Sequence, residues 1–256
     1  MIATVDIGNS NIVIGLMDQD MKLEFCGRIR SARDKNMEEF VIELKTLLDV
    51  YQKSMQDVEG VIISSVVPEL TDSISQGMAL LTGKKPFVVG RGTKTGISIA
   101  TDHPASLGAD LVVDAVAATE GYEGPVIIFD LGTATTCSVV DENKTYLGTL
   151  IIPGIGISLN ALSSKASQLP YIHLEKPRHL VGKNTIESMQ SGIIYGNAAM
   201  LDGLIDRIEA EYGKPMTVIA TGGIAGSIIP LCTHKIHYDP DLLLKGLWYI
   251  YHKNVK

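Results

Sequence analysis

The sequence predicts an α/β protein built from two similar halves. Apolar runs of strand length alternate with segments of helical periodicity along its 256 residues. The segment DIGNSN at residues 6–11 and the segment DLGTAT at residues 130–135 read as one motif written twice, and each lies between two apolar runs. We therefore expect each copy to form a strand, a tight turn and a second strand. No low-complexity linker is present, so residues 1–118 and 119–256 are predicted to be two similar, closely packed domains.

In the first half, the opening hairpin is followed by a helix with one apolar face. Asn36 and Glu39 have the spacing of a capping box at its start. The residues expected on the apolar face are Phe40, Val41, Leu44, Leu47, Leu48 and Tyr51. The further elements predicted here are a strand over 58–67, a helix over 68–81, a strand over 86–90 and a helix over 106–118.

The second half repeats this order of a hairpin followed by helices. The hydrophobic periodicity and the glycine and proline residues that interrupt it predict the elements of this half. These are hairpin strands within 126–140, a strand over 146–152, helices over 158–168 and 186–212, a strand over 216–220 and a helix over 242–252.

Composition limits the class of partner. Hydrophobic residues make up 45% and charged residues 20% of the chain, as in an ordinary globular protein. The net charge of -7 argues against nucleic acid or a membrane surface as a partner. Neither a signal peptide nor an apolar run of the roughly 18 residues of a membrane span is found, which favours a cytoplasmic protein. We interpret Cys26, Cys137 and Cys232 as reduced core residues.

The two turns contain the residue types of a phosphate-binding site. Glycine lets the backbone approach a phosphate, hydroxyl and amide groups donate hydrogen bonds, and an aspartate can hold a cation or its water shell. Neither turn contains lysine or arginine, whereas the lysine of a P-loop contacts the phosphates. The phosphate charge is therefore expected to be neutralised by Mg²⁺, backbone amides and helix ends. An ordinary hydrogen-bonded hairpin turn is the alternative for either copy taken alone.

The ordered set of motifs resembles one family over nearly the whole chain. The motifs are DIGNSN (6–11), KTG (94–96), GAD (108–110), DLGTA (130–134), PGIG (153–156), GKNT (182–185) and TGG (221–223). The doubled Asp-x-Gly hairpin and the late glycine pair resemble the superfamily of sugar kinases, actin and related ATPases, and within it the set resembles the type III pantothenate kinases. This resemblance implies duplicated ribonuclease H-like (actin-like ATPase) domains, each a mixed five-stranded sheet flanked by helices.

The activity implied by the resemblance is the phosphorylation of pantothenate to 4′-phosphopantothenate by ATP, the first step of coenzyme A biosynthesis. The family uses ATP with Mg²⁺ and a monovalent cation, K⁺ or NH₄⁺, and forms a homodimer through helices of the second half. By resemblance, Asp130 coordinates the monovalent cation. The residues expected to bind ATP are Asp6, Ile7, Gly8, Asn9, Ser10, Asn11, Ile12, Val13, Thr133, Gly222 and Gly223. For the glycine pair, a plain strand-to-helix turn is the alternative.

Asp110 is the predicted catalytic residue. Phosphoryl transfer needs a carboxylate that receives the proton of the acceptor hydroxyl late in a loose transition state, and the family counterpart of Asp110 has this role. The alternative, an aspartate stabilised by the dipole of its helix, is compatible with catalysis. Asp114 lies four residues further on and could raise the proton affinity of Asp110, although we prefer a solvated surface position for it.

Two positions depart from the family pattern. Leu111 replaces an arginine that helps to hold the anionic substrate, and Thr101 replaces a substrate-contacting tyrosine. A hydrogen bond to a charged group contributes about 1.5–3 kcal/mol, so we expect loss of the arginine to weaken pantothenate binding by about one to two orders of magnitude. Thr185 matches the residue that reaches the substrate from the neighbouring subunit, with a helix N-cap as its alternative role. The expected substrate-binding residues are Thr101, Gly108, Ala109, Asp110, Leu111 and Thr185.

Three hypotheses about function follow from this pattern. The first is a pantothenate kinase, the second a catalytically weakened nucleotide-binding relative with a regulatory role, and the third a kinase that acts on a different small alcohol. Four intact residues favour the first hypothesis: Asp6, Asp110, Asp130 and Thr133. Leu111 and Thr101 support the second and the third.

Overall fold

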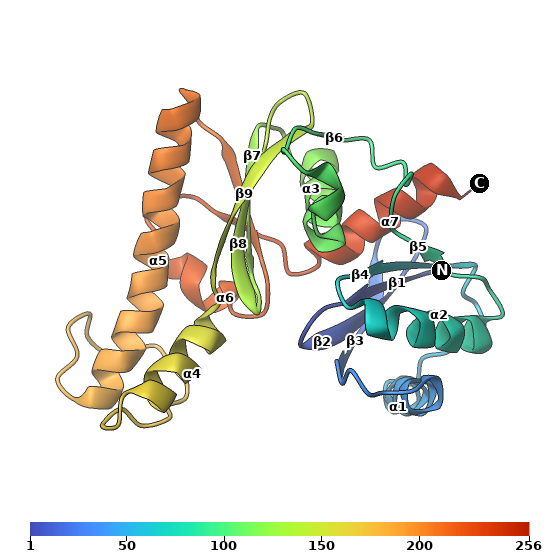
Figure 1. Ribbon diagram of the computed structural model, residues 1–256, viewed down its shortest axis with the longest axis horizontal. Coiled ribbons are helices and arrows are strands. Elements are labelled where there is room, and N and C mark those ends of the chain that lie inside the picture. The colour runs from blue at the N-terminus through green and yellow to red at the C-terminus, as the bar shows by residue number, and fades with distance from the viewer. Residues whose placement is uncertain (256) are drawn as a thin grey trace. The chain divides into compact units, whose positions relative to one another are not determined.

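The computed structural model describes residues 1–255, which divide into two compact units (Figure 1). Unit 1 contains residues 1–97, 102–120 and 241–255, and unit 2 contains residues 98–101 and 121–240. The chain therefore changes unit four times, whereas the sequence suggested a single boundary at residue 118. Local periodicity identified the elements but not the unit to which the last helix and the segment 98–101 belong.

Unit 1 is built on a mixed sheet of five strands, as predicted. Its strands, in the spatial order β3-β2-β1-β4-β5, are β3 (Leu23–Arg30), β2 (Asn11–Met17), β1 (Ile2–Ile7), β4 (Gly60–Ser65) and β5 (Phe87–Val88). Strand β2 is antiparallel to both β1 and β3, whereas β4 is parallel to both β1 and β5. The β1–β2 connection is the turn that carries the first copy of the repeated motif.

Helices cover both faces of this sheet. They are α1 (Met37–Val50), α2 (Pro68–Thr82), α3 (Ala109–Gly121) and α7 (Leu242–Asn254). Val5 and Ile7 of β1 share a core with residues of α1 and α2, whereas Ile2 shares a core with residues of α3 and α7. Because side chains alternate along a strand, Asp6 lies on the same face of the sheet as Ile2, the face covered by α3 and α7.

The predicted capping box of α1 is confirmed. The Asn36 side chain accepts a hydrogen bond from the Glu39 backbone N–H at 2.9 Å, and the Glu39 carboxylate accepts one from the Asn36 N–H at 2.9 Å. Of the predicted apolar face, Phe40, Leu44 and Leu48 are buried. Tyr51 is the C-cap of the helix and is exposed, because the chain turns there and no longer follows the helical period.

Unit 2 is built on six strands and not on the predicted five. Their order is β11 (His237–Tyr238), β10 (Thr217–Thr221), β7 (Val126–Leu131), β8 (Ala134–Val140), β9 (Thr145–Pro153) and β6 (Ser98–Ile99). The extra strand is β6, which pairs in parallel with the open edge of β9. Backbone bonds from Ser98 N–H to the Lys144 carbonyl and from Ala100 N–H to the Tyr146 carbonyl, both at 2.9 Å, hold it there.

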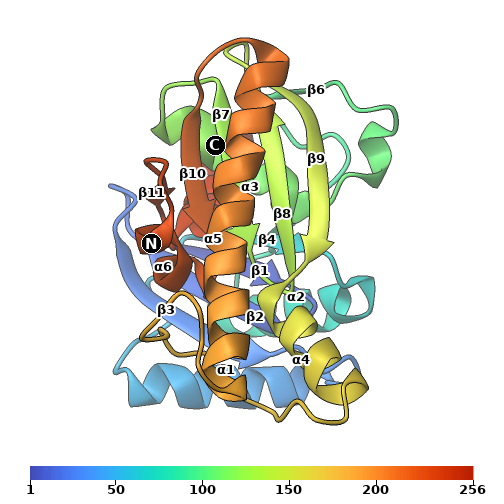
Figure 2. The ribbon, with the colours of Figure 1, turned by 90° about the vertical axis from the view of Figure 1, so that its left-hand side faces the viewer.

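The long helix α5 packs along this second sheet (Figure 2). The helices of unit 2 are α4 (Ile155–Lys165), α5 (Thr185–Tyr212) and α6 (Ala225–Ile228). Leu201 and Ile205 of α5 share a buried core with Ile127 and Phe129 of β7. Within residues 1–255, no helix combines the length and the apolar composition that crossing a bilayer requires.

Two predicted helix starts are displaced by local geometry. The helix predicted over 106–118 begins at Ala109, because a separate 3₁₀ turn, Pro104–Ser106, precedes it. The helix predicted over 158–168 begins earlier, at Ile155, with Gly154 as its N-cap.

The prediction that all three cysteines lie in the core is wrong for one of them. Cys137 is buried, which raises the pKa of its thiol to about 12, and Cys232 is partly buried. Cys26 is exposed because it lies on the polar side of the edge strand β3, on the same face as Arg28 and Arg30. All three are free thiols.

The last helix, α7, belongs to unit 1 because its buried side completes the core under α3. Leu247 and Ile250 pack with Val113 and Val116 of α3. The two helices approach so closely that a Cβ atom at Gly246 would lie 2.1 Å from the Val113 carbonyl oxygen. Only glycine permits this approach.

We expect Gly246→Ala to lower the free energy of unfolding by about 1–3 kcal/mol, because the added methyl group forces α7 away from α3. Gly203→Ala, within α5, is the matched control. Its Cβ would meet only the far end of the Arg207 side chain, so the higher helix propensity of alanine should leave stability within about 1 kcal/mol of the natural value or above it. Denaturant unfolding of both variants measures the difference, and equal stability would contradict the close approach.

Candidate active site

The first turn of the repeated motif is held in place from two sides. Gly8 N–H donates to the Asn11 carbonyl at 3.0 Å and closes the turn. Ser31, at the end of β3, donates its N–H to the Ser10 carbonyl at 3.0 Å and its hydroxyl to the Gly8 carbonyl at 2.6 Å. These bonds fix the backbone of the turn, while the side chains of Asn9 and Ser10 stay exposed. The turn is therefore preorganised to receive a ligand.

Asp6 lies at the base of this turn, beside a buried hydroxyl. It pairs with Val13 on β2 and with Ser64 on β4. The Ser64 hydroxyl is buried and has no hydrogen-bond partner in the described part of the chain. Buried polar groups in native proteins usually have a partner, which can be an ordered water, so this hydroxyl is available to a ligand or its water shell next to Asp6. Sequence patterns did not single out Ser64, which stands in an apolar strand.

Asp110 is in the first turn of α3 and is partly buried. Its Oδ1 atom accepts a hydrogen bond from the Leu111 backbone N–H at 2.8 Å. A Cβ atom at Gly108 would lie 2.4 Å from the same oxygen, so the glycine leaves room for the carboxylate. Burial raises the pKa of Asp110 above its usual value, and the backbone hydrogen bonds oppose this rise only in part. Because α3 covers the sheet face on which Asp6 lies, both carboxylates belong to one face of unit 1.

Asp114 is not the solvated surface residue that we preferred from the sequence. Its side chain is 3% exposed, within an uninterrupted buried run from Val112 to Ala118. Seven consecutive buried residues leave no exposed side of the helix over this run, and its Val113 and Val116 share a core with the sheet and α7. Asp114 follows Asp110 by four residues and is therefore its neighbour along the helix surface.

The second copy of the motif forms a shorter turn than the first. In the β1–β2 hairpin, Ile7 pairs with Ile12 and leaves four residues between them. In the β7–β8 hairpin, Leu131 pairs with Thr135 and leaves three, with Gly132 N–H donating to the Ala134 carbonyl at 3.1 Å. Asp130 and Asp6 have equivalent places in their strands, but the turns that follow them differ by one residue.

Two further glycine motifs meet the second turn within unit 2. A Cβ atom at Gly154 would lie 2.1 Å from the Thr133 carbonyl oxygen. Gly222 has a φ of +97°, and a Cβ atom there would lie 2.6 Å from the Leu131 backbone. The parallel register also places Thr221 beside Asp130. The segments PGIG and TGG, remote in sequence, thus flank the turn that carries Asp130 and Thr133.

The start of α4 adds backbone donors to this end of the sheet. Gly154 is its N-cap and contacts the turn of residues 132–134, so the unpaired N–H groups of the first helical turn begin there. A helix N-terminus favours an anion. The sequence showed the PGIG motif but gave Gly154 no role, because only the folded chain brings it to Thr133.

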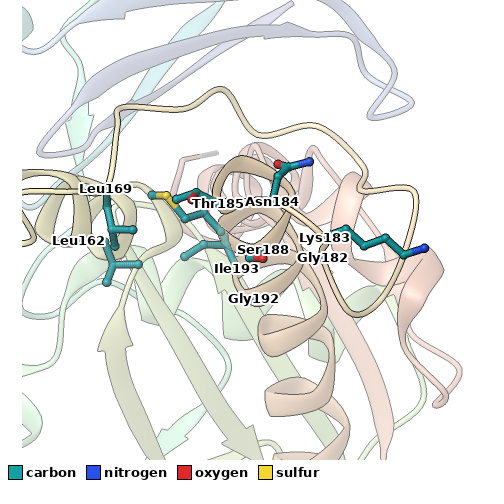
Figure 3. A pocket seen from close by; sticks show the side chains of 10 residues that line it. Leu162, Leu169, Gly182, Lys183, Asn184, Thr185, Ser188, Gly192 and Ile193 are labelled. Carbon is teal, nitrogen blue, oxygen red and sulfur yellow. The ribbon is translucent and has the colours of Figure 1, made fainter.

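Thr185 is the first residue of α5 and does not cap it. The cap is Asn184, whose side chain accepts a hydrogen bond from the Glu187 N–H at 2.9 Å, so the N-cap alternative for Thr185 is wrong. Thr185 is exposed and lines a groove of about 670 Å³ between α4 and α5. Figure 3 shows the apolar side chains of Leu162 and Leu169 on one side of Thr185 and Lys183 on the other.

Thr101 follows strand β6 in unit 2. Its hydroxyl oxygen is buried and has no hydrogen-bond partner within residues 1–255. Leu111 is partly exposed at the start of α3 in unit 1. The two positions at which the chain departs from the family's substrate contacts thus belong to different units.

A metal ion bound to this protein would take many of its ligands from the substrate phosphates and water. Among the described residues, no three His, Cys, Asp or Glu side chains gather closely enough to hold an ion by themselves. Mg²⁺ is commonly held by one or two carboxylates, substrate phosphates and water. Asp6, with the unpartnered Ser64 hydroxyl beside it, fits such a hydrated ion.

Comparison with solved structures defines the class of fold. The activator of 2-hydroxyisocaproyl-CoA dehydratase from Clostridium difficile, solved with bound ADPNP, aligns with a TM-score of 0.57 at 15% identity, over 98% of this chain and 95% of that chain. An inorganic polyphosphate/ATP-glucomannokinase from Arthrobacter aligns with a TM-score of 0.50 at 16% identity, over 99% of each chain. The chain has the duplicated α/β fold of the actin-like ATPases and sugar kinases, as the sequence predicted.

Sequence similarity narrows this class to one family. The profile described as Type III pantothenate kinase matches residues 2–207, and a type III pantothenate kinase from an Exiguobacterium species is 44% identical over 256 residues, the full length of both chains. The chain belongs to the type III pantothenate kinase family. A type III pantothenate kinase from Moorella thermoacetica is 40% identical over 255 residues, which are 99% of this chain and 100% of that one. The resemblance seen in the motifs is thereby confirmed.

The raised pKa of Asp110 predicts a cost in stability at neutral pH. Because the folded state binds the Asp110 proton more tightly than the unfolded state, protonation contributes to stability. This contribution is fully present below the ordinary pKa of an aspartate and is lost as pH rises through the higher pKa of the folded state. We therefore expect Asp110→Asn to raise the melting temperature at pH 7 and to have less effect at pH 3.

The control for this prediction is Asp34→Asn, which makes the same change in charge at an exposed loop position. Its melting temperature should equal that of the natural protein at both pH values. A lower melting temperature for Asp110→Asn at pH 7 would contradict the assigned direction of the shift.

Proposed function

We propose that this chain transfers the γ-phosphoryl group of ATP to the primary hydroxyl of pantothenate and forms 4′-phosphopantothenate, the first step of coenzyme A biosynthesis. Membership of the type III pantothenate kinase family supports the choice of substrate. The observation that carries the chemistry is the partly buried Asp110 carboxylate, which shares one face of unit 1 with Asp6 and the first turn. We further propose that the enzyme works in the cytoplasm, because its three free cysteines suit a reducing compartment.

In this mechanism, Asp110 accepts the proton of the pantothenate hydroxyl. A bond forms between the hydroxyl oxygen and the γ-phosphorus, the bond from that phosphorus to the ADP oxygen breaks, and the proton passes to the carboxylate. The Leu111 N–H holds Oδ1, which leaves the other oxygen of the carboxylate to accept the proton. A pKa above the usual value of aspartate makes this carboxylate a stronger base at neutral pH.

We assign ATP contacts to both turns. In unit 1 these are the residues 6–13, whose turn is fixed by Ser31. In unit 2 they are Thr133, which is exposed in the second turn, and the pair Gly222 and Gly223, where backbone without side chains can lie against the adenosine. The N-terminus of α4 supplies further donors for phosphate oxygens.

Two cations complete the proposed site. We place Mg²⁺ with its water shell at Asp6 and the monovalent cation, K⁺ or NH₄⁺, at Asp130. The Asp130 carboxylate stands beside a turn whose Gly132 and Thr133 carbonyl oxygens face Gly154, and carboxylate and backbone carbonyl oxygens suit a monovalent cation. When bound, both ions neutralise charge on the phosphates.

The proposed enzyme is a homodimer in which Thr185 contacts the substrate bound by the partner. Thr185 is exposed, its hydroxyl is not used as a cap, and its groove includes Leu162, whose side chain is 41% exposed. Apolar surface of this kind is typical of a subunit interface. The regulatory relative and the kinase of another alcohol are not favoured, because relatives 40–44% identical over the full length are pantothenate kinases.

Conversion of pantothenate with ATP, Mg²⁺ and K⁺, followed by mass spectrometry of the product, tests the activity directly. We expect 4′-phosphopantothenate from the natural protein and a kcat lower by about 10²–10⁴-fold for Asp110→Asn, since general base catalysis contributes this much. The KM for ATP should change little. The exposed Asp34→Asn variant is the control and should turn over normally. A natural protein that makes no product would refute the activity, and unchanged turnover by Asp110→Asn would refute the base.

Potassium dependence tests the role of Asp130. We expect Asp130→Asn to raise the K⁺ concentration that gives half-maximal activity by about tenfold or more, because a neutral amide replaces a charged ligand. The Mg²⁺ titration of the same variant should stay close to that of the natural protein. Superimposable K⁺ curves for the two proteins would show that the cation binds elsewhere.

A further inference from the structure

The two motif turns leave the negative charge of the ATP phosphates without a basic side chain. Neither residues 6–11 nor residues 130–135 include lysine or arginine, and the chain as a whole carries a net charge of -7. Asp6 and Asp130 add negative charge at the bases of these turns. Since the turns supply only backbone and neutral donors, basic groups from neighbouring strands would strengthen phosphate binding.

The register of the first sheet brings two arginines of β3 beside the first turn. Arg30 pairs directly with Asn11, the last residue of the turn motif, and Arg28 pairs with Val13. Val13 in turn pairs with Asp6, so Arg28 stands two strands, or roughly 10 Å, from Asp6. Side chains of residues paired across strands point to the same face. Both arginines therefore lie on the face of the sheet that carries Asp6.

The backbone next to these arginines is already part of the turn. Ser31 follows Arg30 directly and makes the two hydrogen bonds that hold Ser10 and Gly8. The end of β3 and the first turn are thus one rigid unit, and Arg30 has a fixed position at its border. Because the backbone at Arg30 is already ordered, ligand binding there requires ordering of the side chain only, which costs less conformational freedom than ordering a flexible loop.

Both arginines are exposed and lack ionic partners. The next basic residues along the chain are already paired, Arg33 with Glu69 at 3.9 Å and Lys35 with Glu43 at 2.6 Å. Neither Arg28 nor Arg30 forms an ion pair within residues 1–255. Both residues lie on the edge strand β3, and both are exposed to solvent. Their guanidinium groups are available to an external anion.

We propose that Arg28 and Arg30 bind the polyphosphate of ATP and supply the positive charge that the motif turns lack, an assignment that rests on the proposed kinase function. A guanidinium group can form two parallel hydrogen bonds to phosphate oxygens. The carboxylate of pantothenate is the competing anion. The polyphosphate is favoured because Arg30 adjoins the turn, whereas α3, which carries Asp110, packs on Ile2 and Ile62 of β1 and β4, away from β3.

Steady-state kinetics of Arg28→Gln, Arg30→Gln and the double variant test this proposal. We expect the KM for ATP to rise by about tenfold in each single variant and further in the double variant, because a charged hydrogen-bonding group is lost. The KM for the acceptor should not change. The KM for ATP should rise equally whether the acceptor is pantothenate or pantothenol, in which an alcohol replaces the carboxylate. Arg30→Lys, which keeps the positive charge, should have a KM for ATP between those of the natural protein and Arg30→Gln.

The matched control is Arg33→Gln. Arg33 lies in the same basic segment and is equally exposed, but it is paired with Glu69 and lies beyond β3. This variant should keep the natural KM for ATP. Exposed charges on an edge strand can also protect the sheet from pairing with another chain. The melting temperatures of all variants show whether the arginines have such a structural role in addition to, or in place of, a role in binding.

Two results would overturn the proposal. If the acceptor KM rises with pantothenate but not with pantothenol, the arginines bind the substrate carboxylate and not ATP. Unchanged KM values, with or without a lower melting temperature, would assign them a structural role.

Direct binding of an ATP analogue tests the arginines independently of kinase activity. If the natural protein does not phosphorylate pantothenate, the proposed function fails, and calorimetric titration with Mg²⁺ and a non-hydrolysable ATP analogue still tests the arginines. We expect a dissociation constant about tenfold higher in each single variant, with unchanged binding of adenosine, which has no phosphates. Equal dissociation constants for the analogue would refute the role of the arginines.

Discussion

At Gly154, Gly222 and Gly246, one backbone approaches another so closely that no side chain fits between them. A Cβ atom would lie 2.1 Å from the Thr133 carbonyl at Gly154, 2.6 Å from the Leu131 backbone at Gly222 and 2.1 Å from the Val113 carbonyl at Gly246. The first two contacts hold the turn that follows Asp130. The third holds α3 against α7 and so determines the position of the helix that carries Asp110. In each unit, the proposed chemistry depends on backbone packing that only glycine allows.

Burial of Asp110 in α3 lowers the stability of unit 1 when the carboxylate is charged and makes that carboxylate a stronger base. Burial raises the pKa of Asp110, because it disfavours the charged form of the carboxylate in the folded state. Asp114, one helical turn further on, is almost completely buried. Strained or destabilised groups of this kind are common at active sites, where the surrounding structure maintains them. The apolar contacts of Val113 and Val116 with α7 provide that support.

The repeated motif has a different supporting structure in each unit. In unit 1 the turn has four residues between its paired strand ends and is held by hydrogen bonds from Ser31. In unit 2 it has three and is held by glycine contacts from two remote segments. Strand β3, which follows the first hairpin, carries two arginines that form no ion pair within residues 1–255, whereas β9, which follows the second hairpin, contains no arginine. This asymmetry supports different roles, with phosphate contacts at the first turn and a cation at the second.

The sequence by itself determined the elements and the motifs. The doubled hairpin, the capping box of α1 and most helices could be predicted, because turn chemistry, capping and periodicity are local properties. The family followed from the resemblance of the ordered set of motifs. Only the tertiary structure decided that α7 joins unit 1, that β6 adds a sixth strand, that Asp114 is buried and that Arg28 and Arg30 lie beside the first turn. Each of these depends on pairing or packing between segments remote in sequence, and a one-dimensional pattern does not specify which partner a strand edge or an apolar helix face will find.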